Sequence, residues 1–86
     1  MKFQGAVIKE QGITFAVVIV KKSVIDIPSD AKKAIQSFQP LFPGIPVLLM
    51  AQDTRGIPTY YGRKNLAHFM ASVPIQAVPW KEYSTT

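Results

Sequence analysis

The fold of this chain is decided by the stretch 13-ITFAVVIV-20. Successive side chains of a β-strand point to opposite faces of the sheet. The odd-numbered positions of this stretch are all apolar, and so are the even-numbered positions after Thr14. Because both faces are apolar, we predict a central strand that is covered on both sides.

The flanks of this stretch carry turn signals. Upstream, residues 3–9 are rich in apolar side chains and are joined to it by 10-EQG-12. Two such runs, separated by a few residues that include glycine, predict a β-hairpin. Downstream, residues 24–27 are β-branched and end at Pro28, and we interpret them as a strand extension or an ordered loop.

A helix is predicted to follow, with Ser29 as its N-cap and Asp30 in its first turn, where a carboxylate interacts favourably with the helix dipole. Its apolar side chains recur at the spacing of one helical face. They are Ala31, Ala34, Ile35 and Phe38. Pro40 removes a backbone donor and is expected to end this helix.

The second half of the chain begins with another pair of strands. Residues 46–51 (PVLLMA) predict a buried strand, and 53-DTRG-56 predicts a turn. Residues 58–62 are the expected return strand. They should lie near the sheet edge, because Pro58 cannot donate a hydrogen bond to a strand ladder.

A second helix is predicted over residues 63–73. Its apolar stripe consists of Leu66, Phe69, Met70 and Val73. Pro74 should close this helix, and we interpret residues 75–80 as the last strand. Residues 81–86 are expected to form a polar C-terminal tail.

These elements follow the order ββαββαβ, which fits a single domain spanning residues 1–86. The connection from the central strand through the first helix to residues 46–51 predicts a parallel pair, whereas the hairpins predict antiparallel pairs. We therefore predict an α+β domain with two layers, a mixed and mostly antiparallel sheet of about five strands and two helices.

Coverage of the second sheet face leads to a prediction about partners. Two helices cover roughly one face of such a sheet, because a helix is about 10 Å across and strands lie about 4.8 Å apart. Either the helices lie on opposite faces, or a second copy of the chain covers the free one. Since large uncovered apolar patches usually mark interfaces, we expect a homodimer. The candidate contact residues are Ala16, Val18 and Val20.

Composition narrows the class of partner. The chain has 86 residues, no cysteine, 48% hydrophobic residues and a formal net charge of +5. Positive charge favours an acidic protein or a nucleic acid as partner, although charge of either sign also serves solubility. No apolar run approaches the ~20 residues of a membrane span, and no secretion leader is recognisable, which favours a cytoplasmic protein without a membrane partner.

No motif assigns a reaction to this sequence. The single histidine, His68, lacks the three or four ligands that a metal site needs. Neither a G-x-S-x-G nucleophile elbow nor a glycine-rich phosphate loop is present. We therefore expect a non-catalytic protein without cofactor or metal.

Aromatic and basic residues come together at one place, 60-YYGRK-64. A tyrosine ring can stack on a nucleobase, and Arg63 and Lys64 at a helix N-terminus could hold a phosphate. Only one of the two tyrosines could join such a surface; alternatively, one packs in the core and the other pairs across the hairpin. The candidate binding surface comprises Arg55, Tyr60, Tyr61, Arg63, Lys64 and His68.

One part of the chain resembles a known family. The segments 44-GIPVLL-49, 53-DTRG-56 and 61-YGR-63, followed by a helix, resemble the C-terminal hairpin and helix of thioredoxin-like domains over about thirty residues. The resemblance implies a cis peptide bond before Pro46. The paired redox cysteines of that family are absent, so thiol–disulfide chemistry is excluded.

Three functions are consistent with these features. We predict a non-catalytic module that self-associates or docks to a protein through an uncovered sheet face. A nucleic-acid-binding protein that uses Arg63 and Lys64 is the alternative. A small-molecule-binding protein or enzyme is the second alternative, because a pocket between helix and sheet is compatible with the sequence.

Overall fold

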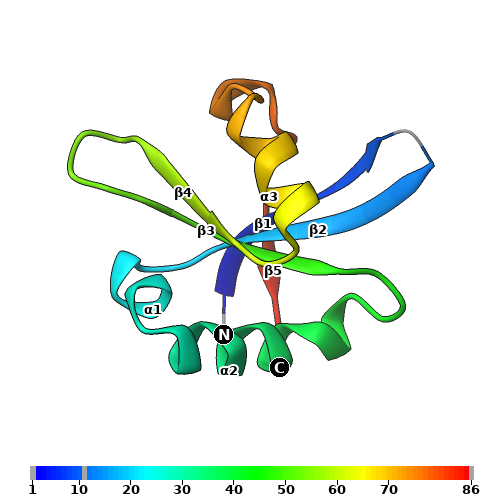
Figure 1. Ribbon diagram of the computed structural model, residues 1–86. Coiled ribbons are helices and arrows are strands. Elements are labelled where there is room, and N and C mark those ends of the chain that lie inside the picture. The colour runs from blue at the N-terminus through cyan, green and yellow to red at the C-terminus, as the bar shows by residue number, and fades with distance from the viewer. Residues whose placement is uncertain (1, 11, 86) are drawn as a thin grey trace.

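The computed structural model describes residues 2–10 and 12–85, which form a five-stranded sheet with helices on both sides (Figure 1). The strands are β1 (Lys2–Glu10), β2 (Ile13–Ile19), β3 (Val47–Gln52), β4 (Pro58–Tyr61) and β5 (Lys81–Ser84). The helices are α1 (Lys22–Asp26), α2 (Pro28–Phe38) and α3 (Lys64–Ala71). Two 3-10 turns, η1 (Gln39–Leu41) and η2 (Ile75–Ala77), follow α2 and α3.

The sheet has the strand order β4-β3-β2-β1-β5, so β2 is central as predicted. Strands β2 and β3 are parallel and are connected through α1 and α2. The pairs β1–β2, β1–β5 and β3–β4 are antiparallel. The predicted α+β class, the mixed and mostly antiparallel sheet and the order of its elements are confirmed, and α1 is an additional short helix.

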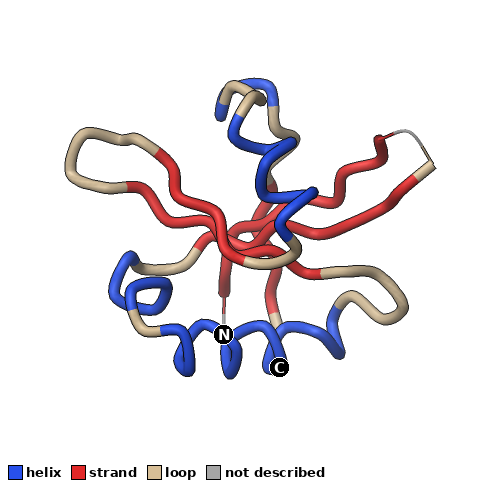
Figure 2. The backbone as a smooth tube through the Cα atoms, viewed as in Figure 1, coloured by secondary structure: helices blue, strands red, loops and turns tan. Residues whose placement is uncertain are grey.

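The number of layers differs from the prediction. Figures 1 and 2 show α1 and α2 on one side of the sheet and α3 on the other. Each side has its own cluster of buried residues. The domain therefore has three layers, because β2 and β3 are apolar on both faces and each face is covered by helices of the same chain.

The even-numbered and odd-numbered side chains of β2 belong to different clusters. Beneath α1 and α2, Ala16 and Val18 pack with residues of β3, α1, α2 and the loop after η1, including Ile25, Ala31, Phe42, Val47 and Leu49. Beneath α3, Phe15 and Val17 pack with Leu48, Met50, Leu66, Met70 and Val78. The predicted stripe of the second helix is confirmed: Leu66 and Met70 are buried, and Phe69 and Val73 pack against the same cluster.

The segment between β2 and α2 is helical, not a strand extension or loop. Residues Lys22–Asp26 form α1, in which Lys22 Nζ and Asp26 Oδ1 are 2.7 Å apart across one turn. The buried Ile25 anchors this turn in the cluster beneath α2. The N-cap of α2 is Ile27, not Ser29, because Pro28 occupies the first helical position, where its missing N–H costs nothing.

The prediction for the C-terminal region was also wrong. Residues 75–80 form η2 and an irregular segment, and the predicted polar tail contains β5. Pro79 interrupts the apolar run, and Trp80 folds back so that its Nε1 donates a hydrogen bond to Ile75 O at 3.1 Å. Strand β5 forms because Tyr83 stacks on Phe3 of β1, with ring centroids 5.1 Å apart and planes 10° apart.

The Ile45–Pro46 peptide bond is trans, as are the other peptide bonds of the described residues, so the cis bond implied by the thioredoxin-like resemblance is not present. No helix formed by residues 2–10 or 12–85 is long and apolar enough to span a lipid bilayer.

Candidate functional site

The predicted partner-facing residues are not available to a partner. Ala16 and Val18 are fully buried beneath α1 and α2, and Val20 packs against the same cluster. The expectation of an uncovered face at these positions was wrong. The reason is that α3 covers the other face by itself, which leaves α1 and α2 free to cover this one (Figure 1).

The two tyrosines of the predicted aromatic surface point to opposite faces and are both packed against the core. Tyr60 packs against the cluster beneath α3, and Tyr61 packs against the cluster beneath α2. The Tyr60 hydroxyl is buried without a hydrogen-bond partner among the described residues, and this burial raises the pKa of Tyr60 above its usual value. Both residues are half-buried and, being on opposite faces, do not form one surface.

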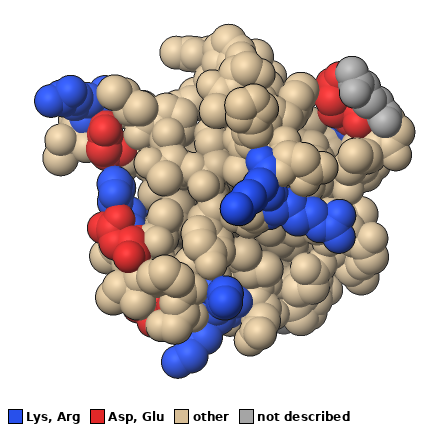
Figure 3. Space-filling model, viewed as in Figure 1, with Lys and Arg blue, Asp and Glu red and all other residues tan. Residues whose placement is uncertain are grey.

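The basic residues of that predicted surface are exposed but separated. Arg55 lies in the turn of the β3–β4 hairpin, whereas Arg63 precedes α3 and Lys64 begins it, at the opposite end of β4. His68 lies one helical turn after Lys64 and is also exposed. On the side of the molecule shown in Figure 3, the Lys and Arg side chains form several groups instead of one patch.

The outer strands β4 and β5 each have one unpaired side among the described strands, and part of β1 forms a further open edge. On the outer side of β1, strand β5 pairs only with Lys2–Gly5. No described strand pairs with β1 beyond Gly5 on that side, and the β1–β2 hairpin extends away from the body of the sheet (Figure 1). The second half of β1, with the sequence 6-AVIKE-10, is therefore an open edge.

The hydrogen bonds of β2 identify which residues face this edge. Ala16 N–H and Val20 N–H donate to Pro46 O and Met50 O on the β3 side, at 2.9 and 2.8 Å. Because backbone groups alternate along a strand, the odd-numbered residues of β2 face β1. Their register partners in β1 are Ala6, Ile8 and Glu10.

It follows that Val7 and Lys9 direct their backbone N–H and C=O groups away from the sheet, along the open edge. Val7 is 40% exposed, similar to Ile13 of β2 at 42%, whereas most apolar residues of the sheet are buried. The open edge of β1 thus combines free donors, free acceptors and an exposed apolar side chain.

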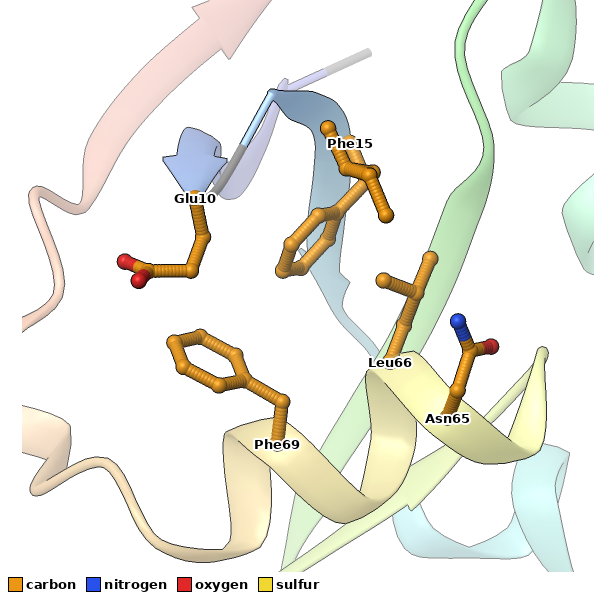
Figure 4. Close-up of a pocket in the computed structure, with 6 residues that line it drawn as sticks. Glu10, Phe15, Asn65, Leu66 and Phe69 are labelled. Carbon is orange, nitrogen blue, oxygen red and sulfur yellow. The ribbon is translucent and has the colours of Figure 1, made fainter.

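A pocket of about 240 Å³ lies between α3 and the β1–β2 hairpin. It is lined by Glu10, Ile13, Phe15, Asn65, Leu66 and Phe69. Figure 4 shows the rings of Phe15 and Phe69 on its walls, and their planes are perpendicular with centroids 6.4 Å apart. The carboxylate of Glu10 and the carboxamide of Asn65 lie at different ends of the apolar walls (Figure 4).

The titratable residues of the described chain are dispersed. No three of its His, Asp or Glu side chains lie close enough together to hold a metal ion. Asp53, the acidic residue nearest to Arg55 in sequence, is engaged in its own turn, where Oδ1 accepts hydrogen bonds from the backbone N–H of Arg55 and Ile57.

Sequence reasoning missed both the edge and the pocket. The edge depends on the length of β5, which is set by the fold and not by any motif in β1. The pocket joins two segments that lie more than fifty residues apart in the sequence. One signal was present: Ile13 and Phe15 give β2 bulky side chains toward α3 at its free end, where Ile13 remains 42% exposed.

Comparison with protein-family models, with curated proteins and with solved structures finds no match for this chain. The function is therefore inferred from the surfaces of the chain itself. The absence of a matching solved structure, together with the trans Ile45–Pro46 bond, leaves the thioredoxin-like resemblance without structural support.

Proposed function

We propose that this protein is a non-catalytic, self-associating module whose contact with a second copy is made by the open edge of β1. The observation that carries the proposal is the outward direction of the Val7 and Lys9 backbone groups in an otherwise apolar segment. An edge with free N–H and C=O groups is a template for pairing with another strand. The two copies would share one continuous sheet.

The register of such a pair follows from symmetry and charge. Two identical edges related by a two-fold axis pair antiparallel, with opposite residues on the same face of the sheet. A register centred on Lys9 would place like charges opposite each other, which is unfavourable. A register centred on Val7 would place Lys9 opposite Gly5, which is already paired with Lys81 of β5.

A register centred on Ile8 avoids both problems. Each Val7 would lie opposite Lys9 of the other copy, and both residues direct their backbone groups to the edge, so each pair can exchange two hydrogen bonds. The two Ile8 side chains would meet at the centre, where a non-hydrogen-bonded pair brings side chains closest. The aliphatic stem of Lys9 would cover the exposed Val7.

Such a contact buries little surface, so the expected affinity between the two copies is low. It uses one strand segment from each copy, well below the roughly 1,000 Å² that stable interfaces bury. We therefore expect a monomer–dimer equilibrium that depends on protein concentration, with dissociation in the high-micromolar range or weaker.

The test is solution mass by size-exclusion chromatography with light scattering over a wide concentration range. Val7→Pro removes the outward N–H and leaves the hydrogen bonds to β2 in place, since proline is tolerated at strand edges. Val7→Thr keeps the N–H and is the matched control. We expect the wild type and Val7→Thr to dimerise as concentration rises, and Val7→Pro to stay monomeric.

A second measurement keeps the proposal testable if Val7→Pro fails to fold. In amide hydrogen exchange of the wild type, Val7 and Lys9 should become protected at high protein concentration, whereas exposed amides elsewhere should not. A monomer at every concentration, or a dimer in which these two amides exchange as fast as in the monomer, would refute contact through the edge of β1.

A further inference from the structure

We infer that the pocket between α3 and the β1–β2 hairpin binds a small organic amine with an aromatic or branched aliphatic body. This inference does not depend on self-association, because the apolar walls of the pocket lie on the α3 side of the sheet. Of the lining residues only Glu10 belongs to the open-edge segment of β1, and its backbone groups face β2. The inference rests on three properties of the pocket, namely its apolar walls, one carboxylate and its size.

The walls select an apolar group. Phe15 and Leu66 are buried and form the base, while Phe69 is half-buried and Ile13 is substantially exposed. Phe15 and Phe69 already stand edge to face, with centroids 6.4 Å apart. Aromatic rings favour such edge-to-face and offset contacts, so a third ring or a branched alkyl group fits between these walls.

The carboxylate selects the charge of the ligand. Glu10 lines the pocket, and Figure 4 shows its side chain at one end of the apolar walls, with the carboxylate on the side away from the two rings. The ion pairs among the described residues are Lys2–Glu82 and Lys22–Asp26, so Glu10 has no cationic partner in that part of the chain. A carboxylate at the edge of an apolar cavity favours a cationic head group and disfavours an anionic one.

Asn65 adds a second polar contact at the other end of the pocket. Its carboxamide has both a donor and an acceptor and forms no hydrogen bond with another side chain or with the backbone of the described residues. A hydroxyl or amide substituent on the body of the ligand can therefore be recognised there. Because Glu10 and Asn65 lie at different ends of the pocket, they would together fix the orientation of the ligand.

The volume limits the size of the ligand. At about 240 Å³ the pocket is slightly smaller than the ~300 Å³ at which sites for drug-sized ligands begin. The ligand is thus of fragment size, comparable to a single ring with a short side chain. For so few atoms, dissociation constants near 1 mM are expected.

The experiment is an NMR titration of the backbone amides with three matched probes at low salt. Phenethylamine, 2-phenylethanol and 3-phenylpropionate share a phenyl ring and carry a positive, neutral or negative end. We expect the amides of Phe69, Asn65 and Phe15 to shift with phenethylamine. Its affinity should exceed that of the alcohol by about two- to five-fold, the range of an exposed ion pair, with the carboxylate weakest.

Glu10→Gln should abolish this preference and leave the binding of 2-phenylethanol unchanged. Glu82→Gln, which removes an exposed carboxylate on β5 opposite Gln4 and outside the pocket lining, is the control and should retain the preference. Three results would overturn the inference: no probe shifts the pocket amides up to about ten times the expected dissociation constant, the three probes bind equally to the wild type, or Glu10→Gln keeps the preference for the amine.

Discussion

Substitution of Gly62 by alanine should destabilise the protein far more than substitution of the turn glycines Gly12, Gly44 and Gly56. Gly62 lies between β4 and α3 and has a φ of +149°, a conformation that residues with a Cβ rarely adopt. A Cβ built there would lie 3.4 Å from Leu48 Cα and would overlap Leu48 Cδ2. Leu48 is fully buried in β3, so its side chain has little room to move away.

The magnitude is the sum of two costs. A non-glycine residue in this backbone region costs about 1–3 kcal/mol. Forcing an extra methyl group into a packed core costs about 1–3 kcal/mol more. Gly62→Ala should therefore lower the free energy of unfolding by about 2–6 kcal/mol, a large part of the roughly 5–15 kcal/mol that holds a small domain together.

Gly44→Ala is the matched control, because Gly44 has a φ of +80° but no atom within 4 Å of the added Cβ. It should lose only the backbone cost, about 1–2 kcal/mol. Urea unfolding followed by circular dichroism compares the two variants. For a domain of this size each 1 kcal/mol corresponds to roughly 4–8 °C in Tm, so the packing cost of about 1–3 kcal/mol that Gly62→Ala carries alone should separate the two melts by about 4–24 °C.

Leu48→Ala gives a further check if Gly62→Ala is too unstable to measure alone. The smaller side chain makes room for the new methyl group, so the double variant should be more stable than the sum of the single effects by about 1–2 kcal/mol. Equal losses in Gly62→Ala and Gly44→Ala, or strict additivity with Leu48→Ala, would show that Gly62 is not required for close packing against β3.

Two further substitutions test particular polar groups. Tyr60→Phe removes a buried hydroxyl without a partner and should leave stability at pH 7 unchanged or raise it by up to about 1 kcal/mol in urea unfolding. Because burial raises the pKa of Tyr60, the unfolded chain ionises first, and the wild type should lose stability relative to Tyr60→Phe as pH rises above about 10. A wild type that gains stability relative to Tyr60→Phe above that pH would contradict this. Asp53→Ala removes the carboxylate oxygen that accepts hydrogen bonds from Arg55 N–H and Ile57 N–H, at 2.8 and 2.9 Å, and should cost about 1–2 kcal/mol in thermal unfolding. Asp53→Asn keeps an acceptor and should recover most of that loss; equal stability of Asp53→Ala and the wild type would show that these bonds are not needed.

The central part of the fold was predictable from hydrophobic patterning. A strand that is apolar at both parities has to be covered on both faces, and β2 is covered on both. The turn at 53-DTRG-56 was likewise predicted, and Gly56 adopts a positive φ in it. The apolar faces of a strand and the position of a turn depend on residues that are neighbours in the sequence, so both could be predicted from it.

The features that were missed depend on contacts between distant segments. Strand β5 contains only one apolar residue, Tyr83, and its pairing with β1 depends on a ring from the other end of the chain. The amphipathic helices could not show whether one or both faces of the sheet are covered. A helix has the same apolar stripe whichever face of the sheet it packs against.

The candidate sites were missed for a related reason. The aromatic and basic cluster at residues 60–64 is contiguous in sequence, but strand geometry sends Tyr60 and Tyr61 to opposite sides. Contiguity in the chain therefore did not imply contiguity in space. The pocket shows the converse, since Glu10 and Phe69 line it together although no sequence pattern links them.

Because helices cover both faces of the sheet, the surface through which a second copy could stabilise this chain differs from the one predicted. An 86-residue chain without cysteine was expected to use a second copy as a missing layer. Since α1, α2 and α3 supply both layers, another copy stacked on a face would replace helix contacts instead of adding to them. A second copy can instead satisfy free backbone groups at the sheet edges, including those on β1 beyond β5, by adding a strand. Association of this protein is thus expected to extend the sheet sideways and to leave the pocket beneath α3 free for a ligand.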